Sequence, residues 1–183
     1  MLPLSAPPKT FRDIVEADLR RAARLIVKVQ DDIDWQFRIA TPDGDYHLAV
    51  TMPTDATMRT SMLRKVETFL DWKRAIAFTL AVETVLPLGN DVSCDAVYAL
   101  GVSKREVVNC MALIRRKPMP WTAANFGAVE WLDAESADPV LVKLLAHTPR
   151  AMTPKLVAAL EYMFGATGRF PAVHIPTGEV RGV

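Results

Sequence analysis

A hydrophobic period of two marks one stretch of the N-terminal half of the chain. Trp35 and Phe37 alternate with polar residues, and the alternation resumes with Tyr46 and Leu48 after a Pro-Asp-Gly turn. Two alternating runs around such a turn are typical of a β-hairpin that buries one face. The pattern therefore predicts a hairpin over 35–52 with these four large side chains packed on the core.

Apolar residues at helical spacing predict helices where a capping residue stands at or near the start of the run. Ser103 and Glu106 have the spacing of a capping box, and Thr10, Asp138 and Thr153 are further capping residues. The predicted helices cover 10–30, 53–72, 104–116, 138–146 and 153–164.

Alternating or continuous apolar runs predict strands at 35–40, 46–52, 75–82, 96–100, 126–132 and 170–175. The order of elements is then α-ββ-α-β-β-α-β-α-α-β, which defines an α+β fold. Strands that follow one another without a helix favour an antiparallel or mixed sheet of about five to six strands covered by helices. This order of helix, hairpin, helix and further strands resembles that of the roadblock and longin interaction domains.

Length and composition predict one domain over 1–183, with a loose lead-in at 1–9 and a tail at 176–183. The 22 basic and 21 acidic side chains leave a net charge of +1, so no global field favours nucleic acid or an anionic membrane. Two cysteines make no disulfide framework, and no apolar run reaches the roughly 20 residues of a membrane span. The start of the chain has no signal-peptide pattern. These features predict a soluble, cytoplasmic protein without a membrane partner.

Linear motifs for phosphate loops, structural zinc and nucleophile elbows do not occur in the sequence. We therefore expect neither a bound metal nor a cofactor. Asp43, Asp45 and His47 alternate along the predicted hairpin and could supply ligands to a metal. A solvated outer face of the hairpin explains the same three residues without one, and we prefer that interpretation.

Glu130 is a candidate buried acid because it lies between Val129 and Trp131 in an apolar strand. Burial would raise its pKa and suit it to general acid or base chemistry. Because a strand alternates its faces, the side chain could equally meet solvent or an arginine. Cys110 falls on the apolar stripe of its predicted helix, so we expect it in the core rather than at a catalytic site.

The segment Leu100-Gly-Val-Ser-Lys-Arg-Glu-Val107 resembles the turn and second-helix start of a helix-turn-helix motif. The resemblance covers 93–114 and implies a DNA-binding protein whose recognition helix presents Ser103, Lys104, Arg105 and Asn109 to the major groove. The sequence departs from the motif at Val97, where the family has a small residue that lets its two helices cross.

A second interpretation of this segment is a strand, a glycine turn and a capped helix. Ser103, Lys104 and Arg105 would then lie at a helix N-terminus, where free N–H groups and two cations favour an anion. This arrangement predicts an enzyme that acts on an anionic small molecule, such as a nucleotide or acyl-CoA.

The hypothesis that we place first is a non-catalytic binding or regulatory module that acts through a protein partner, including a second copy of itself. It depends on the lack of reactive motifs, on the 8 methionines and 4 tryptophans, and on an antiparallel sheet edge that could pair. Under this hypothesis the chain is a binding protein rather than an enzyme.

Overall fold

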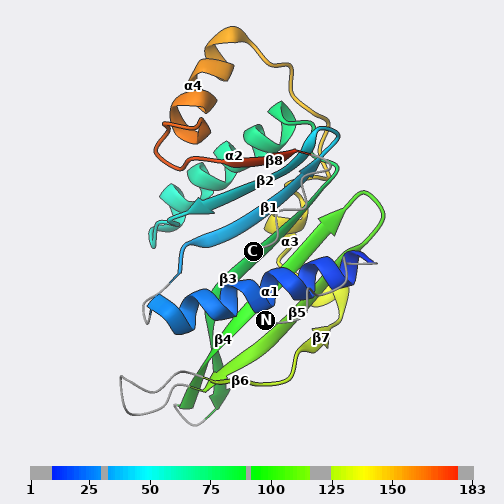
Figure 1. The fold of residues 1–183 in the computed structure, drawn as a ribbon, viewed down its shortest axis with the longest axis vertical. Helices are drawn as coiled ribbons and strands as arrows, with labels where there is room; N and C mark the ends of the chain where they lie inside the picture. Colours follow the sequence, from blue (N-terminus) through cyan, green and yellow to red (C-terminus); the bar gives the residue numbers. More distant parts are fainter. Residues whose placement is uncertain (1–9, 30–32, 90–91, 116–124, 177–183) are drawn as a thin grey trace, which may run out of the picture.

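The computed structural model of the chain describes residues 10–29, 33–89, 92–115 and 125–176, which form helices on both faces of one sheet (Figure 1). The helices are α1 (Phe11–Val29), α2 (Ala56–Trp72), α3 (Pro139–Val142) and α4 (Pro154–Phe164), with a 3₁₀ helix η1 (Ala134–Ser136). The strands are β1 (Trp35–Thr41), β2 (Gly44–Val50), β3 (Ala77–Gly89), β4 (Val92–Ser103), β5 (Val107–Arg115), β6 (Asn125–Phe126), β7 (Glu130–Leu132) and β8 (Val173–Pro176).

The sheet runs in the order β6-β5-β4-β3-β1-β2-β8, and β7 also pairs with β5. Every pairing between described strands is antiparallel. Because β1 lies between β2 and β3, the chain crosses β1 through α2 on its way from β2 to β3. The predicted α+β class with an antiparallel sheet covered by helices is confirmed, and the sheet has eight strands rather than five to six.

Helix α1 covers the face of the sheet formed by β3, β4 and β5. Its start is capped as predicted, because Thr10 Oγ1 accepts a hydrogen bond from the Asp13 amide at 3.2 Å and Asp13 accepts one from the Thr10 amide at 2.7 Å. Glu16 and Arg20, four residues apart on the helix, form an ion pair at 2.7 Å. The core under α1 consists of small and branched side chains: Val15, Leu19, Ala22, Ala23, Ile26, Ala81, Val97, Ala99, Val108, Cys110, Ala112 and Ile114.

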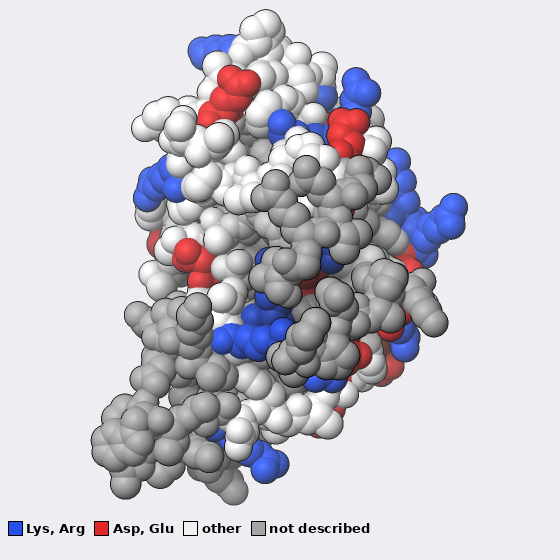
Figure 2. Space-filling view, viewed as in Figure 1, with Lys and Arg blue, Asp and Glu red and all other residues white. Residues whose placement is uncertain are grey.

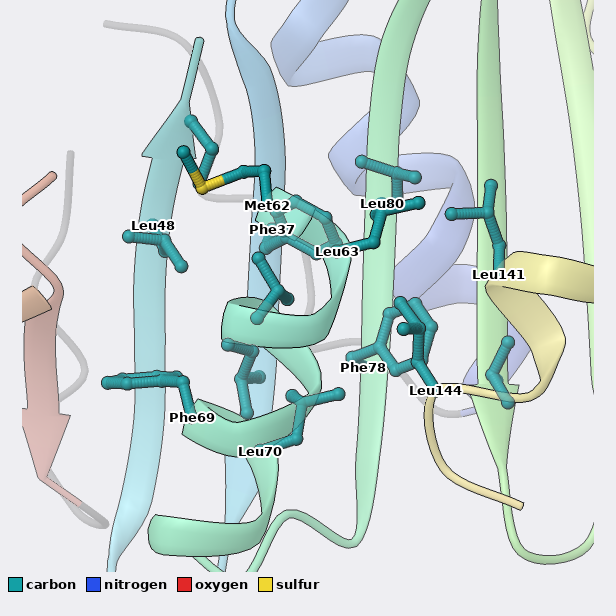
Figure 3. Close-up of a cluster of buried hydrophobic side chains, with 14 of the residues drawn as sticks. Phe37, Leu48, Met62, Leu63, Phe69, Leu70, Phe78, Leu80, Leu141 and Leu144 are labelled. Carbon is teal, nitrogen blue, oxygen red and sulfur yellow. The ribbon is translucent and has the colours of Figure 1, made fainter. Parts of the chain in front are cut away.

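The larger core lies on the opposite face, between the sheet and α2, α3 and α4 (Figure 3). Phe37 and Leu48 of the β1–β2 hairpin are buried there, and Trp35 and Tyr46 pack against them half-buried, as the alternation predicts. The turn between the two strands uses Gly44 at φ 134°, a conformation that a residue with a side chain rarely adopts.

The predicted helix at 104–116 is wrong, because β4 and β5 form a hairpin there. Val102 pairs with Val107, and a two-residue turn of Lys104 and Arg105 joins the strands. The side chains of β5 are apolar on both sides, so the sequence fits a helical stripe as well as a strand. In the fold the side chains alternate. Those of Val108, Cys110, Ala112 and Ile114 face α1, and those of the residues that alternate with them face the opposite side of the sheet.

Smaller differences concern the ends of elements. β3 continues to Gly89, beyond the strand predicted at 75–82, and the strand predicted at 126–132 is divided into β6 and β7. The helix predicted at 138–146 keeps only its capped first turn, whereas α4 begins and ends as predicted. The lead-in at 1–9 and the tail after Pro176 lie outside the described residues.

No helix in the described ranges is long and apolar enough to cross a lipid bilayer.

Candidate functional site: the outer face of helix α1

Basic side chains gather on the outer face of α1, where Figure 2 shows a group of Lys and Arg side chains. Arg20, Arg21 and Arg24 lie within two turns of the helix, and all three are exposed. Arg20 pairs with Glu16, and Arg21 Nη1 lies 2.8 Å from Nδ1 of His47 on β2. Among the described residues, Arg24 makes no hydrogen bond or ion pair, so its charge is available to a partner.

A pocket of about 110 Å³ opens beside these arginines, between α1 and the strands β5 and β6. Its floor is apolar, and Arg20 and Arg24 stand at its rim. The apolar lining comes from Leu19, Ala23, Ala112, Phe126, Gly127 and Val129. We call it the arginine-rimmed pocket. Ligand pockets for drug-sized molecules begin at about 300 Å³, so this pocket suits a single aliphatic side chain better.

A surface of the opposite character lies on the connection from β7 through η1 to α3. Asp133, Glu135 and Asp138 are exposed, and the sequence from 125 to 142 contains no lysine or arginine. Val140 of α3 has 53% of its surface exposed, and its amide donates to Asp138 Oδ1 at 2.8 Å. We call these four residues the acidic edge.

A second pocket, of about 150 Å³, opens on the other flank of α1 above β1 and β3. Beside it Arg38 forms an ion pair with Asp45 at 2.6 Å, and Thr79 Oγ1 donates to the buried Asp18 at 2.6 Å. Burial raises the pKa of Asp18, although the Thr79 hydrogen bond and Arg38 oppose the shift. These groups form a nearly buried polar network between the helix and the sheet, and we call the opening the Arg38 pocket.

His47 belongs to the same network. Burial lowers its pKa to about 4, and the positive charges of Arg21 and Arg38 add to the effect. The ring is therefore neutral near pH 7 and can accept the hydrogen bond from Arg21. Asp45 and His47 share a face, as predicted, and there Arg38 contacts Asp45 and Arg21 contacts His47. No group of three or more potential metal ligands is found among the described residues.

The anion site predicted at Ser103, Lys104 and Arg105 lacks its helix. Ser103 Oγ accepts hydrogen bonds from the amides of Arg105 and Glu106, at 3.2 and 3.1 Å, so those N–H groups are already used. Lys104 and Arg105 are exposed in the turn between β4 and β5. The structural basis for a nucleotide or acyl-CoA enzyme at this point is therefore absent.

The helix-turn-helix prediction for 93–114 is also wrong, because this segment is a β-hairpin and contains no recognition helix. Asn109, which the resemblance would place against DNA, is completely buried, and its side-chain amide lies 3.0 Å from Ser136 Oγ of η1. Its role in the fold is to hold η1 against β5.

Glu130 is exposed on β7, opposite Met111 of β5, so the predicted buried acid is wrong. Cys110 is in the core as predicted, and burial raises its pKa to about 12, which keeps the thiol protonated and unreactive.

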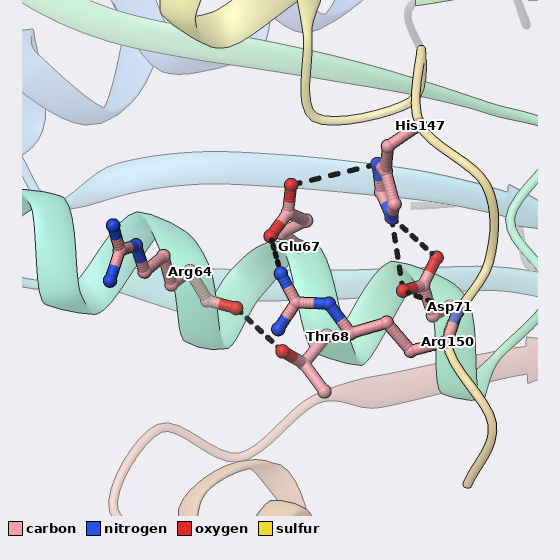
Figure 4. A network of polar contacts seen from close by, with 6 residues as sticks. All are labelled: Arg64, Glu67, Thr68, Asp71, His147 and Arg150. Atoms are coloured by element: carbon pink, nitrogen blue, oxygen red, sulfur yellow. Dashed lines mark hydrogen bonds and ion pairs between the residues drawn. The ribbon is translucent and has the colours of Figure 1, made fainter.

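His147 forms a further polar cluster, which Figure 4 shows between α2 and the segment after α3. Its Nε2 lies 2.9 Å from Asp71 Oδ1, and Glu67 forms an ion pair with Arg150 at 2.7 Å. The hydrogen bond to Asp71 raises the pKa of His147. These side chains fasten the segment to the helix rather than line a cavity.

Sequence reasoning missed Arg24, Arg38 and Asp18 as residues of interest. Alternation along β1 and β2 places Arg38 beside His47 and Asp45, and that signal was available. Asp18 lies within the apolar stripe of α1, which marks it as a buried carboxyl. The pocket beside Arg24 depends on β6, whose position no local pattern gives.

Comparison with family models, with curated proteins and with solved structures gave no match. The likeness of element order to roadblock and longin domains therefore stays a prediction.

Proposed function

We propose that the chain is a non-catalytic binding module that associates with further copies of itself through the outer face of α1. The observation that carries the proposal is the complementarity of two of its surfaces. The arginine-rimmed pocket has an apolar lining with two arginines, and the acidic edge combines an exposed valine with three exposed carboxylates that lie within seven residues of it in the sequence. In the proposed contact, Val140 of one copy enters the arginine-rimmed pocket of the next.

Charge supports the same pairing. Arg24 and Arg20 at the rim would face Asp138 and Glu135 across the contact. Opposite potentials of this kind steer association and suppress contacts between like surfaces.

The contact we propose is small and therefore weak. Burial of one valine contributes about 1.5 kcal/mol or more, and each exposed ion pair about 0.2–1 kcal/mol. Further contacts around the pocket would have to offset the entropy lost on association, so we expect a dissociation constant between about 10 µM and 1 mM. Because the two surfaces differ, the contact is heterologous and extends head to tail into a ring or an open chain.

The test is the average mass in solution, measured by sedimentation equilibrium over a range of concentrations. We expect the mass to rise above the 20.3 kDa of one chain with concentration and to fall back in high salt, because exposed ion pairs are screened. Val140→Asp and Arg24→Glu should each leave a monomer at concentrations where the parent chain associates.

Two matched variants serve as controls. Val173→Asp changes a valine of similar exposure on β8, and Arg105→Glu reverses an exposed arginine in the β4–β5 turn. Both should associate like the parent chain. A parent chain that stays monomeric at every concentration, or controls that dissociate as readily as the two test variants, would refute the proposal.

A further inference from the structure

The Arg38 pocket has the features of a small-molecule site that is separate from the proposed association surface. It lies on the flank of α1 that faces β1 and β3, whereas the arginine-rimmed pocket lies on the flank that faces β5 and β6. Its apolar lining comes from Phe11, Ile14, Ala40, Ala77 and Phe78, and its polar lining from Arg38, Asp45 and Thr79.

The polar part of the lining offers both donors and acceptors. Nε and Nη2 of Arg38 contact Asp45 Oδ2 at 2.7 and 2.6 Å. Nη1 lies 4.0 Å from the nearest carboxylate oxygen, Asp18 Oδ1, which is beyond hydrogen-bond distance. The N–H groups on Nη1 can therefore donate to a ligand. Thr79 donates its own hydrogen to Asp18, so its oxygen keeps lone pairs that can accept.

Charge at the pocket is already balanced. The guanidinium of Arg38 is paired with the carboxylate of Asp45, and Asp18 lies behind them. An anionic ligand would approach two carboxyl groups, and a cationic ligand would approach Arg38. Either would enter a partly buried site with an uncompensated charge, which costs free energy. A neutral molecule avoids this cost.

Size sets the second limit. An apolar cavity of about 150 Å³ engineered into another protein holds benzene. The Arg38 pocket has about the same volume, so it fits one ring and not a nucleotide or a drug-sized ligand.

We infer that the Arg38 pocket binds a small neutral molecule the size of a single six-membered ring that carries a hydroxyl group. The ring packs against Phe11 and Ile14 of α1 and Ala77 of β3, and the hydroxyl accepts a hydrogen bond from Arg38 Nη1. Phenol is the simplest probe of this chemistry.

The experiment is a titration of the full chain with phenol, benzene, benzoate and benzylamine, followed by the amide and methyl NMR signals. We expect phenol to bind about tenfold more tightly than benzene, because only phenol can accept a hydrogen bond from the charged Arg38 side chain. Benzoate and benzylamine should bind more weakly than phenol, and the shifts should centre on Ile14 and Thr79.

A filled pocket tests the location without removing a polar group. Ala77→Leu places extra carbon atoms in the pocket, and its fold is checked by the spread of its NMR signals. Ala49→Leu makes the same change at an exposed position of β2 on the same face of the sheet, outside the pocket. We expect phenol binding to fall at least tenfold in Ala77→Leu and to persist in Ala49→Leu.

If Ala77→Leu does not fold, two results on the parent chain decide the inference. They are the ranking of the affinities for the four probes and the location of the NMR shifts. Any other ranking, shifts that centre elsewhere, or undiminished phenol binding in a folded Ala77→Leu would overturn the inference.

Discussion

At the scale of single residues, Gly101 of β4 lies directly against side chains of α1. A Cβ atom added there would lie 2.3 Å from Val15 Cγ2 and 3.0 Å from the ring of Phe11. Gly127, between β6 and β7, has its nearest neighbour, the amide nitrogen of Leu113, at an ordinary 3.7 Å. The two glycines therefore differ in whether a methyl group forces α1 away from its strands.

We predict that Gly101→Ala lowers the free energy of unfolding by about 1–3 kcal/mol, the usual cost of forcing extra atoms into a packed core. Gly127→Ala should change it by less than about 0.5 kcal/mol, since the added methyl group makes only ordinary contacts there. Urea unfolding of both variants checks the pair. Equal stability of the two variants would mean that α1 does not rest on Gly101.

Two histidines give the stability of the chain opposite dependences on pH. The pKa of His147 is raised by its hydrogen bond to Asp71, so the folded state holds its proton more firmly than the unfolded state. Its contribution is complete below the unfolded pKa of about 6.5 and is lost as the pH rises through the folded pKa. His47 behaves in the reverse way, because its folded pKa is lowered to about 4.

We predict that His147→Gln flattens the fall in stability above about pH 6.5 and leaves the acid side unchanged. His47→Gln should flatten the rise between pH 4 and 6.5, where the unfolded state binds the proton that the folded state refuses. Each slope stays below about 1.4 kcal/mol per pH unit, because the folded and unfolded states differ by at most one proton at each histidine. Urea unfolding across this range measures both, and two variants with parallel profiles would contradict the assignment.

At the scale of elements, β5 is the segment where the sequence predicts a helix and the fold has a strand. The capping-box residues Ser103 and Glu106 make the expected local hydrogen bond, yet the chain continues as a strand. A helical stripe would bury Met111 and leave Ala112 outside. In the hairpin, Ala112 is 2% exposed beneath α1, and Met111 is only half-buried on the opposite face.

We predict that Ala112→Gln costs more stability than Met111→Gln, by about 1–3 kcal/mol, because only the first places an amide in the core under α1. The helical interpretation predicts the reverse order. Thermal or urea unfolding of the two variants decides between them, and a larger loss in Met111→Gln would rule out the strand.

Local determinants explain which elements were predictable. The caps of α1 and α4 and the glycine turn of the β1–β2 hairpin act within a few residues, and the sequence predicts all three. For β5, apolar side chains point to both faces, so no period distinguishes a strand from a helix. Burial between α1 and η1 decides the outcome, and this contact joins distant parts of the chain.

At the scale of the whole molecule, the proposed association site also combines features that local sequence predicts with features that depend on contacts between distant parts of the chain. The sequence predicts a helix over 10–30, which carries Arg20 and Arg24, and a helix cap at Asp138. It does not predict that Phe126 closes an apolar pocket beside those arginines, or that Val140 stays exposed. A net charge of +1 hides both surfaces, because the separated charges cancel in the sum.

Self-association through these two surfaces is the central claim, and exchange of their charges tests it most directly. One variant carries Arg20→Glu and Arg24→Glu, and the other carries Asp133→Lys, Glu135→Lys and Asp138→Lys. Each alone places like charges on both sides of the contact and should sediment as a monomer. Mixed in equal amounts, the two variants form two matched pairs. The unchanged arginine rim of the second faces the unchanged acidic edge of the first, and the glutamate rim of the first faces the lysine edge of the second.

Sedimentation of the mixture is therefore the deciding measurement. The account predicts that the mixture regains the concentration-dependent association of the parent chain, with the two variants alternating, because every contact then joins opposite charges. A mixture that stays monomeric while the parent chain associates, or single variants that associate as the parent does, would contradict it.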